Sequence, residues 1–139
     1  MLGEKIGELT GKMTGLRVLG GTDHDHHHGP RMEVSIQQQG KMLGVEVTDN
    51  GTYESCLQTG GFMSGVGRGV SMSKEGDVVT WTATGIGRPT GKGMGAAWRG
   101  SIHYQTTSSK LAKLNGVCYV FEHDVDESGN STGRVFEWR

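Results

Sequence analysis

The segment richest in metal-ligating side chains is a polar loop with four histidines and two aspartates, Asp23-His24-Asp25-His26-His27-His28. Imidazole and carboxylate groups at such spacing ligate zinc, nickel or copper. His24, His26 and His28 are therefore candidate metal ligands. The alternative is a solvated hairpin loop that binds metal only adventitiously, because nothing in the sequence supplies the second shell that orients the ligands of a built site.

Charged side chains embedded in strand-like stretches form a second candidate set. A carboxylate in an apolar cavity has a raised pKa and can act as a general acid or base. Glu54 and Glu122 are on this ground the candidate catalytic residues of an isomerase or cyclase that needs no cofactor. The alternative places these residues on the wet outer face, with aromatic residues inside. We favour the second arrangement, because burial of charge is costly unless the charge is paired.

Aromatic residues recur at alternate positions of the same stretches, where they could fill a core, line a pocket or form an oligomer interface. With one arginine they make up the candidate ligand-binding set: Tyr53, Trp81, Trp98, Arg99, Tyr104, Tyr119 and Phe121. Alternation alone does not decide which face of each strand points inward.

The elements that must position these residues are strands. Gly, Asn, Asp and Pro clusters divide the chain into about eight stretches of roughly 8–16 residues, nearly all with alternating apolar and polar residues. This pattern predicts an all-β protein, a single eight-stranded antiparallel up-and-down β-barrel. One short helical turn is expected near 109–115, where Ser109 precedes Lys110 and Asn115-Gly116 stops the segment. The Asp49-Asn50-Gly51 triplet predicts a kink or bulge inside a strand.

Glycines make a further prediction about packing. Gly65, Gly67 and Gly69 fall on one face of a single strand. Such a row lets a large side chain pack against bare backbone, and Trp81 or Trp98 from neighbouring strands would fit there.

Composition limits the function classes. The 139 residues fit one domain, 1–139, and 14 basic against 15 acidic residues give no net attraction to nucleic acid or to acidic membranes. The N-terminus lacks the apolar stretch of a signal peptide, and no run approaches a membrane span, so a cytoplasmic location is the default expectation. Cys56 and Cys118 are expected to be free thiols.

Several phrases carry a resemblance: the Gly65–Val70 glycine ladder, Thr80-Trp81-Thr82, Gly85-Ile86-Gly87-Arg88-Pro89, Lys110-Leu111-Ala112-Lys113-Leu114-Asn115 and Val120-Phe121-Glu122. From about residue 3 to the end, the chain resembles a family of uncharacterised small proteins of bacteria and archaea. It is more distantly similar to the allene-oxide-cyclase and dirigent barrels. That distant similarity implies eight strands around a mostly apolar cavity, and oligomerisation.

The leading hypothesis is a barrel, forming a homo-oligomer, that binds a small apolar or amphipathic organic molecule in its lumen. The first alternative hypothesis is an isomerase or cyclase that needs no cofactor. The second is metal binding through residues 23–28.

Overall fold

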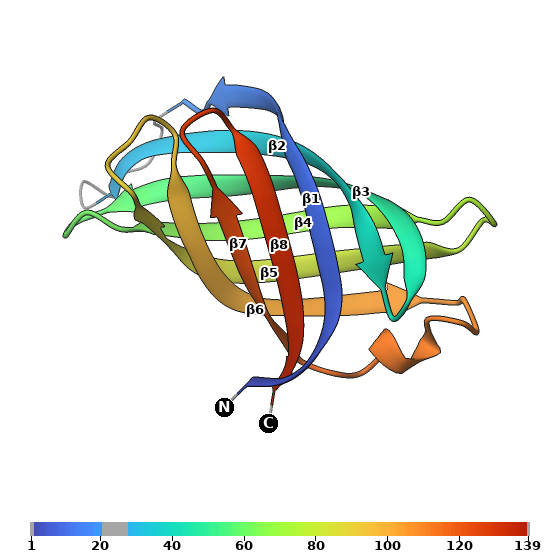
Figure 1. Ribbon diagram of the computed structural model, residues 1–139. Coiled ribbons are helices and arrows are strands. Elements are labelled where there is room, and N and C mark those ends of the chain that lie inside the picture. The colour runs from blue at the N-terminus through green and yellow to red at the C-terminus, as the bar shows by residue number, and fades with distance from the viewer. Residues whose placement is uncertain (1, 21–27, 139) are drawn as a thin grey trace.

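The chain folds into a closed antiparallel β-barrel (Figure 1). The structure is a computed structural model that describes residues 2–20 and 28–138, with only the backbone path at residues 28 and 29. Its elements are β1 (Leu2–Val18), β2 (His28–Met42), β3 (Val45–Gln58), β4 (Met63–Met72), β5 (Val78–Pro89), β6 (Ala96–Thr106), the 3-10 turn η1 (Ala112–Leu114), β7 (Tyr119–Val125) and β8 (Asn130–Trp138).

Each strand pairs with the next along the chain, and β1 pairs with β8 to close the barrel. The closing pair runs from Leu2 opposite Trp138 to Lys12 opposite Asn130, so the two ends of the described chain lie side by side (Figure 1). The eight-stranded up-and-down barrel expected from the alternation and the turn clusters is thereby confirmed, as is the short helical turn near 109–115.

Two tryptophans pack against the predicted glycine row. A Cβ atom added at Gly69 would lie 2.3 Å from the Trp81 ring, and one added at Gly65 would lie 2.7 Å from the Trp98 ring. Gly51 and Gly87 extend the same arrangement on the neighbouring strands β3 and β5. The indoles therefore occupy space that side chains would otherwise fill, and Trp81 and Trp98 both point into the barrel.

One end of the barrel is filled by the segment around η1. Leu111 and Leu114 are fully buried and pack in the core with Leu9, Met42 and Tyr104. The Asn115 side chain fixes this segment to the end of β6, because its Oδ1 accepts a hydrogen bond from the Thr106 N–H and its Nδ2 donates one to the Thr106 carbonyl oxygen, both at 2.9 Å. The lumen is therefore closed by apolar side chains at this end.

Two local features concern the turn between β2 and β3 and the triplet Asp49-Asn50-Gly51. The two-residue turn between β2 and β3 has positive φ at both Leu43 (50°) and Gly44 (78°), the geometry of tight hairpins that match strand twist. Of the kink or bulge predicted at Asp49-Asn50-Gly51, the bulge is not observed: in this described strand, both the β2 and the β4 pairings pass through the triplet without a shift of register. Register shifts occur in β1, between Met13 and Gly15 in its pairing with β2, and between Leu2 and Gly7 in its pairing with β8.

Cys56 and Cys118 are free and half-buried. In the part of the chain that the structure describes, no helix is long and apolar enough to cross a membrane.

Candidate functional site

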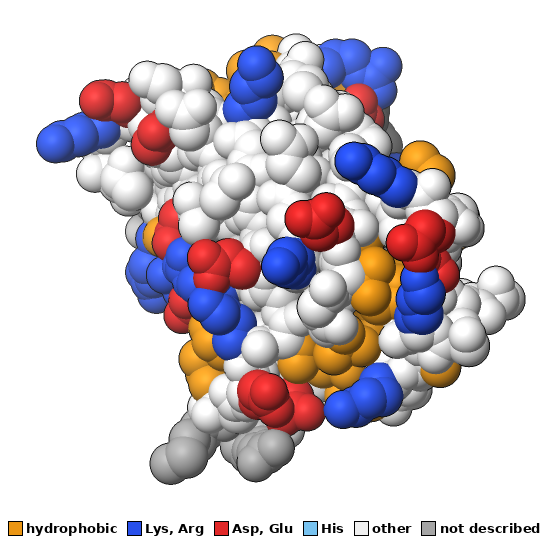
Figure 2. Space-filling view, turned by 45° about the vertical axis from the view of Figure 1, so that its right-hand side comes forward, with side chains coloured by type: hydrophobic (Ala, Val, Ile, Leu, Met, Phe, Trp, Pro, Cys, Tyr) orange, Lys and Arg blue, Asp and Glu red, His pale blue; other side chains and the backbone are white. Residues whose placement is uncertain are grey.

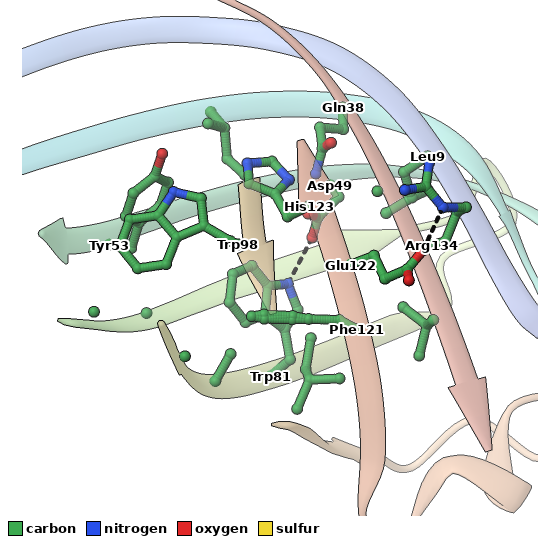
Figure 3. Close-up of a pocket in the computed structure, with 18 of the residues that line it drawn as sticks. Leu9, Gln38, Asp49, Tyr53, Trp81, Trp98, Phe121, Glu122, His123 and Arg134 are labelled. Carbon is green, nitrogen blue, oxygen red and sulfur yellow. Dashed lines mark hydrogen bonds and ion pairs between the residues drawn. The ribbon is translucent and has the colours of Figure 1, made fainter. Parts of the chain in front are cut away.

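The barrel holds a cavity of about 100 Å³ that is partly open to solvent (Figure 3). Its wall is mainly apolar and aromatic, because alternate residues of each strand point inward. The main side chains are Leu9, Ile36, Met42, Tyr53, Trp81, Ala83, Trp98, Ile102, Tyr104, Phe121 and Val135. Tyr53 and Trp98 contact each other edge-to-face, with ring centroids 5.4 Å apart, and so form one continuous aromatic surface.

A buried polar cluster interrupts this wall on β2, β3, β4 and β8. Asp49 is only 2% exposed, and its Oδ1 accepts hydrogen bonds from Trp81 Nε1 at 2.7 Å and from Ser71 Oγ at 2.8 Å. Gln38 lies opposite Asp49 in the β2–β3 pair, and its Oε1 accepts a hydrogen bond from Ser131 Oγ at 3.0 Å. The Asp49 carboxylate and the Gln38 amide thus connect β2, β3, β4 and β8 with the Trp81 indole.

Two opposing effects set the protonation of Asp49. Burial raises the pKa of its carboxyl group above the usual value, while the hydrogen bonds from Trp81, Ser71 and Gln38 lower it, and burial is the larger effect. The carboxyl group therefore takes up a proton at a higher pH than an exposed aspartate does.

His123 is the second polar group in the lining, and it lies on β7 next to Tyr53 (Figure 3). Its Nε2 atom is buried without a hydrogen-bond partner among the described residues. Burial lowers the pKa of the imidazole to about 4, and the nearby Asp124 charge opposes that shift only in part. Burial also raises the pKa of Tyr53 to about 12. At neutral pH both side chains are consequently uncharged.

The structure brings together five of the seven residues predicted to bind ligand. Tyr53, Trp81, Trp98, Tyr104 and Phe121 line the cavity. Tyr119 also points inward, but it packs at the end closed by η1, where its hydroxyl donates a 3.2 Å hydrogen bond to the Lys113 carbonyl oxygen. Arg99 lies on the outer face of β6, with a side chain that is 51% exposed.

Charged residues of β6, β7 and β8 form a network of ion pairs. Arg134 Nε lies 2.9 Å from Glu122 Oε1, and Arg134 Nη2 lies 2.8 Å from Asp124 Oδ2. Arg99 binds the same two carboxylates from the other side, at 3.7 Å and 2.8 Å. Burial raises the pKa of Asp124, but the two arginines outweigh that effect and hold the pKa below its usual value. This network ties β6, β7 and β8 together.

The two predicted catalytic carboxylates therefore have arginine partners. Glu122 is among the residues of the cavity wall, but its carboxylate pairs with Arg134 (Figure 3). Glu54 lies on the outer face of β3, 3.7 Å from Arg31. A catalytic role for Glu54 or Glu122 stays a prediction.

Over the face of the molecule seen in Figure 2, acidic and basic side chains are interspersed, and hydrophobic side chains are exposed among them. That mixture agrees with the near-neutral sequence, which carries a formal net charge of −1. The homo-oligomer predicted from the sequence stays a prediction.

The predicted metal loop lies largely outside the described residues. This holds for His24 and His26, while His28 begins β2 and its side chain is not described. Within the described ranges, no three His, Cys, Asp or Glu side chains gather in a way that could hold a metal ion.

The barrel geometry matches solved structures of bacterial proteins. A protein of unknown function from Clostridium acetobutylicum superposes with a TM-score of 0.80 at 14% identity, over 98% of each chain. A β-barrel like protein from Acinetobacter baumannii gives 0.80 at 13% identity, over 100% of this chain and 96% of its own. A conserved protein of unknown function from Rhodopseudomonas palustris gives 0.79 at 13% identity, over 99% and 97%.

The chain shares the fold of these bacterial β-barrel proteins. No protein-family model and no curated protein matches it. The more distant similarity to the allene-oxide-cyclase and dirigent barrels stays a prediction.

Sequence reasoning missed the buried polar residues of the lumen, Asp49, Gln38 and His123. The alternation of inward and outward residues along each strand could have identified them. Asp49 follows Val47 on the inward face, and His123 follows Tyr119 and Phe121. Assigning a kink to Asp49-Asn50-Gly51 removed the aspartate from its alternation pattern.

Replacing Asp49 with alanine is expected to lower the free energy of unfolding by about 2 kcal/mol, because two buried donors, Trp81 Nε1–H and Ser71 Oγ–H, lose their acceptor. Asp49→Asn is expected to cost less, since its Oδ1 still accepts. Urea denaturation measures both. Asn50→Ala, at the adjacent exposed position, is the control and is expected to change stability by less than about 0.5 kcal/mol. Equal losses at residues 49 and 50 would contradict this account.

Proposed function

We propose that this protein binds a small apolar or amphipathic organic molecule in the lumen of its barrel. The observation that carries the proposal is the composition of the cavity wall. Aromatic and aliphatic side chains from strands around the barrel surround about 100 Å³ of space, and a few polar groups converge on it. Apolar pockets with few, placed polar groups are typical of small-molecule sites.

The size of the cavity limits the ligand. A cavity of about 150 Å³ lined by Leu, Ile and Phe binds benzene or xenon. The lumen is of the same order, and its edge-to-face rings of Tyr53 and Trp98 favour a flat, apolar guest. The part of the proposed ligand that lies inside the lumen is therefore about the size of a single ring.

The test uses benzene, detected by ligand-observed NMR, and xenon, detected by xenon NMR. The wild-type protein is expected to bind both, and Gly133→Ala is expected to weaken benzene binding. A Cβ at residue 133 would sit in the cavity wall at ordinary contact distance, 3.6 Å from Gln38 Oε1 and 3.8 Å from His123 Nδ1, so the variant should fold.

Gly15→Ala is the matched control, because it adds the same methyl group on β1 at an exposed position away from the cavity. Its binding is expected to equal that of the wild type. Native mass spectrometry of protein purified without a metal column adds a second readout, an extra mass carried by the barrel. A wild-type protein that binds neither probe and carries no extra mass would contradict the proposal.

A further inference from the structure

The unpartnered Nε2 atom of His123 identifies a polar position within the cavity wall. A buried polar atom without a hydrogen bond costs about 1–3 kcal/mol, so folded proteins pair such atoms with protein groups, water or ligand. No described residue pairs with this one, although the ring lies in the lining beside the aromatic surface of Tyr53. A ligand hydroxyl that reaches this buried atom would therefore supply the hydrogen bond that the described residues do not.

The group that fits is one that both donates and accepts. Neutral imidazole carries its proton on one nitrogen, so Nε2 either donates or accepts according to the tautomer. A hydroxyl group can do either, whereas a carbonyl only accepts and an ammonium only donates. A hydroxyl consequently matches Nε2 in both tautomers.

The charges around the lumen favour a neutral guest. Asp49 already receives hydrogen bonds from Trp81 and Ser71, and an anionic ligand would meet this carboxylate in a medium of low dielectric constant. Arg134, the basic residue among the lining residues, is engaged by Glu122 and Asp124. Asp124, next to His123 in the chain, pairs with Arg99 as well. Among the described lining residues, the cationic side chain is already paired with carboxylates. It is therefore not available to bind an anionic ligand.

The proposal, which rests on the proposed function, combines these observations. We propose that the lumen selects a neutral, ring-sized molecule with one hydroxyl group, which forms a hydrogen bond with His123 Nε2 while its ring lies against Tyr53, Trp98 and Phe121. Within the proposed function, His123 is thus a specificity-determining residue, and the aromatic surface supplies the apolar contact.

The test compares phenol with benzene at neutral pH by ligand-observed NMR or calorimetry. The two probes have almost the same ring and differ by the hydroxyl group. One hydrogen bond to a buried partner should make phenol bind about five- to tenfold more tightly than benzene to the wild-type protein. In His123→Leu this preference is expected to disappear, with benzene binding retained. His103→Leu, which changes an exposed histidine on the outer face of β6, is the matched control and should keep the preference.

A second measurement, made on the wild-type protein, tests the same hydrogen bond if His123→Leu fails to fold. In the wild-type protein, phenol should shift the imidazole nitrogen resonance of His123, and benzene should shift it much less. Equal affinities for phenol and benzene, or a preference that survives in His123→Leu, would overturn this inference and leave lumenal binding intact. Absence of binding for both probes would instead contradict the proposed function itself.

Discussion

Replacing Gly69 with alanine is expected to lower the free energy of unfolding by about 3 kcal/mol. A Cβ atom at this position would lie 2.3 Å from Cε2 and Cζ2 of the Trp81 ring, far inside van der Waals contact. The indole cannot move away freely, because its Nε1 is hydrogen-bonded to buried Asp49. Overpacking of this kind costs about 1–3 kcal/mol, and the fixed ring puts Gly69 at the upper end of that range. Guanidinium denaturation followed by tryptophan fluorescence measures the effect.

The control for Gly69→Ala is Gly15→Ala, where the nearest atom to the added Cβ is 3.7 Å away. That variant is expected to match the wild type or to gain up to about 1 kcal/mol, because alanine restricts the unfolded chain. Combining Gly69→Ala with Trp81→Phe tests the cause, since a smaller ring should recover part of the loss and make the two effects non-additive. Equal stabilities of the Gly69 and Gly15 variants would refute the packing argument.

Lowering the pH is expected to destabilise the barrel through His123. Its pKa is about 4 in the folded protein against 6.5 for an unperturbed histidine, so the unfolded chain binds this proton first as the pH falls. The neutral imidazole contributes fully to the free energy of unfolding above about pH 6.5. This contribution declines between about pH 6.5 and 4, and it does not fall further below about pH 4. The total loss for such a shift is about 3 kcal/mol. Denaturation curves recorded at several pH values measure it.

The variant His123→Leu separates this effect from other titrations, because it should remove the decline between about pH 6.5 and 4. His103→Leu, on the outer face, should keep the wild-type profile. Asp49 acts in the opposite direction, since its raised pKa means that the folded protein takes up this proton more readily than the unfolded chain, and stability is gained as the carboxyl group becomes protonated. If the stability of the wild type and of His123→Leu changed with pH in the same way, burial would not lower the pKa of the His123 imidazole as described.

The barrel could be predicted from the sequence because the patterns that specify its strands and turns lie within short stretches of the chain. The alternation of Met32, Val34 and Ile36 with polar neighbours, and the turn chemistry between strands, specify antiparallel strands without reference to distant residues. The packing of Trp81 and Trp98 over glycine was also predictable, because a row of glycines on one face needs a large partner.

The polar part of the lumen was less predictable, because its partners come from different strands. Asp49 is tolerated inside only because Ser71 on β4 and Trp81 on β5 both direct donors at one oxygen. That convergence depends on the register between strands, which no single stretch encodes. Likewise, the burial that lowers the pKa of His123 comes from residues scattered along the chain, and composition gives no measure of it.

The pairing of β1 with β8 also determines when the protein can fold during synthesis. Of the eight barrel strands, β8 leaves the ribosome last, and until it emerges β1 lacks one of its two hydrogen-bonding partners. A nascent chain of seven strands is thus an open sheet with two unpaired edges, able to pair with other chains. Closure joins residues separated by nearly the whole sequence, the kind of contact that makes folding slow. The barrel is consequently most exposed to misassembly just before its final strand arrives.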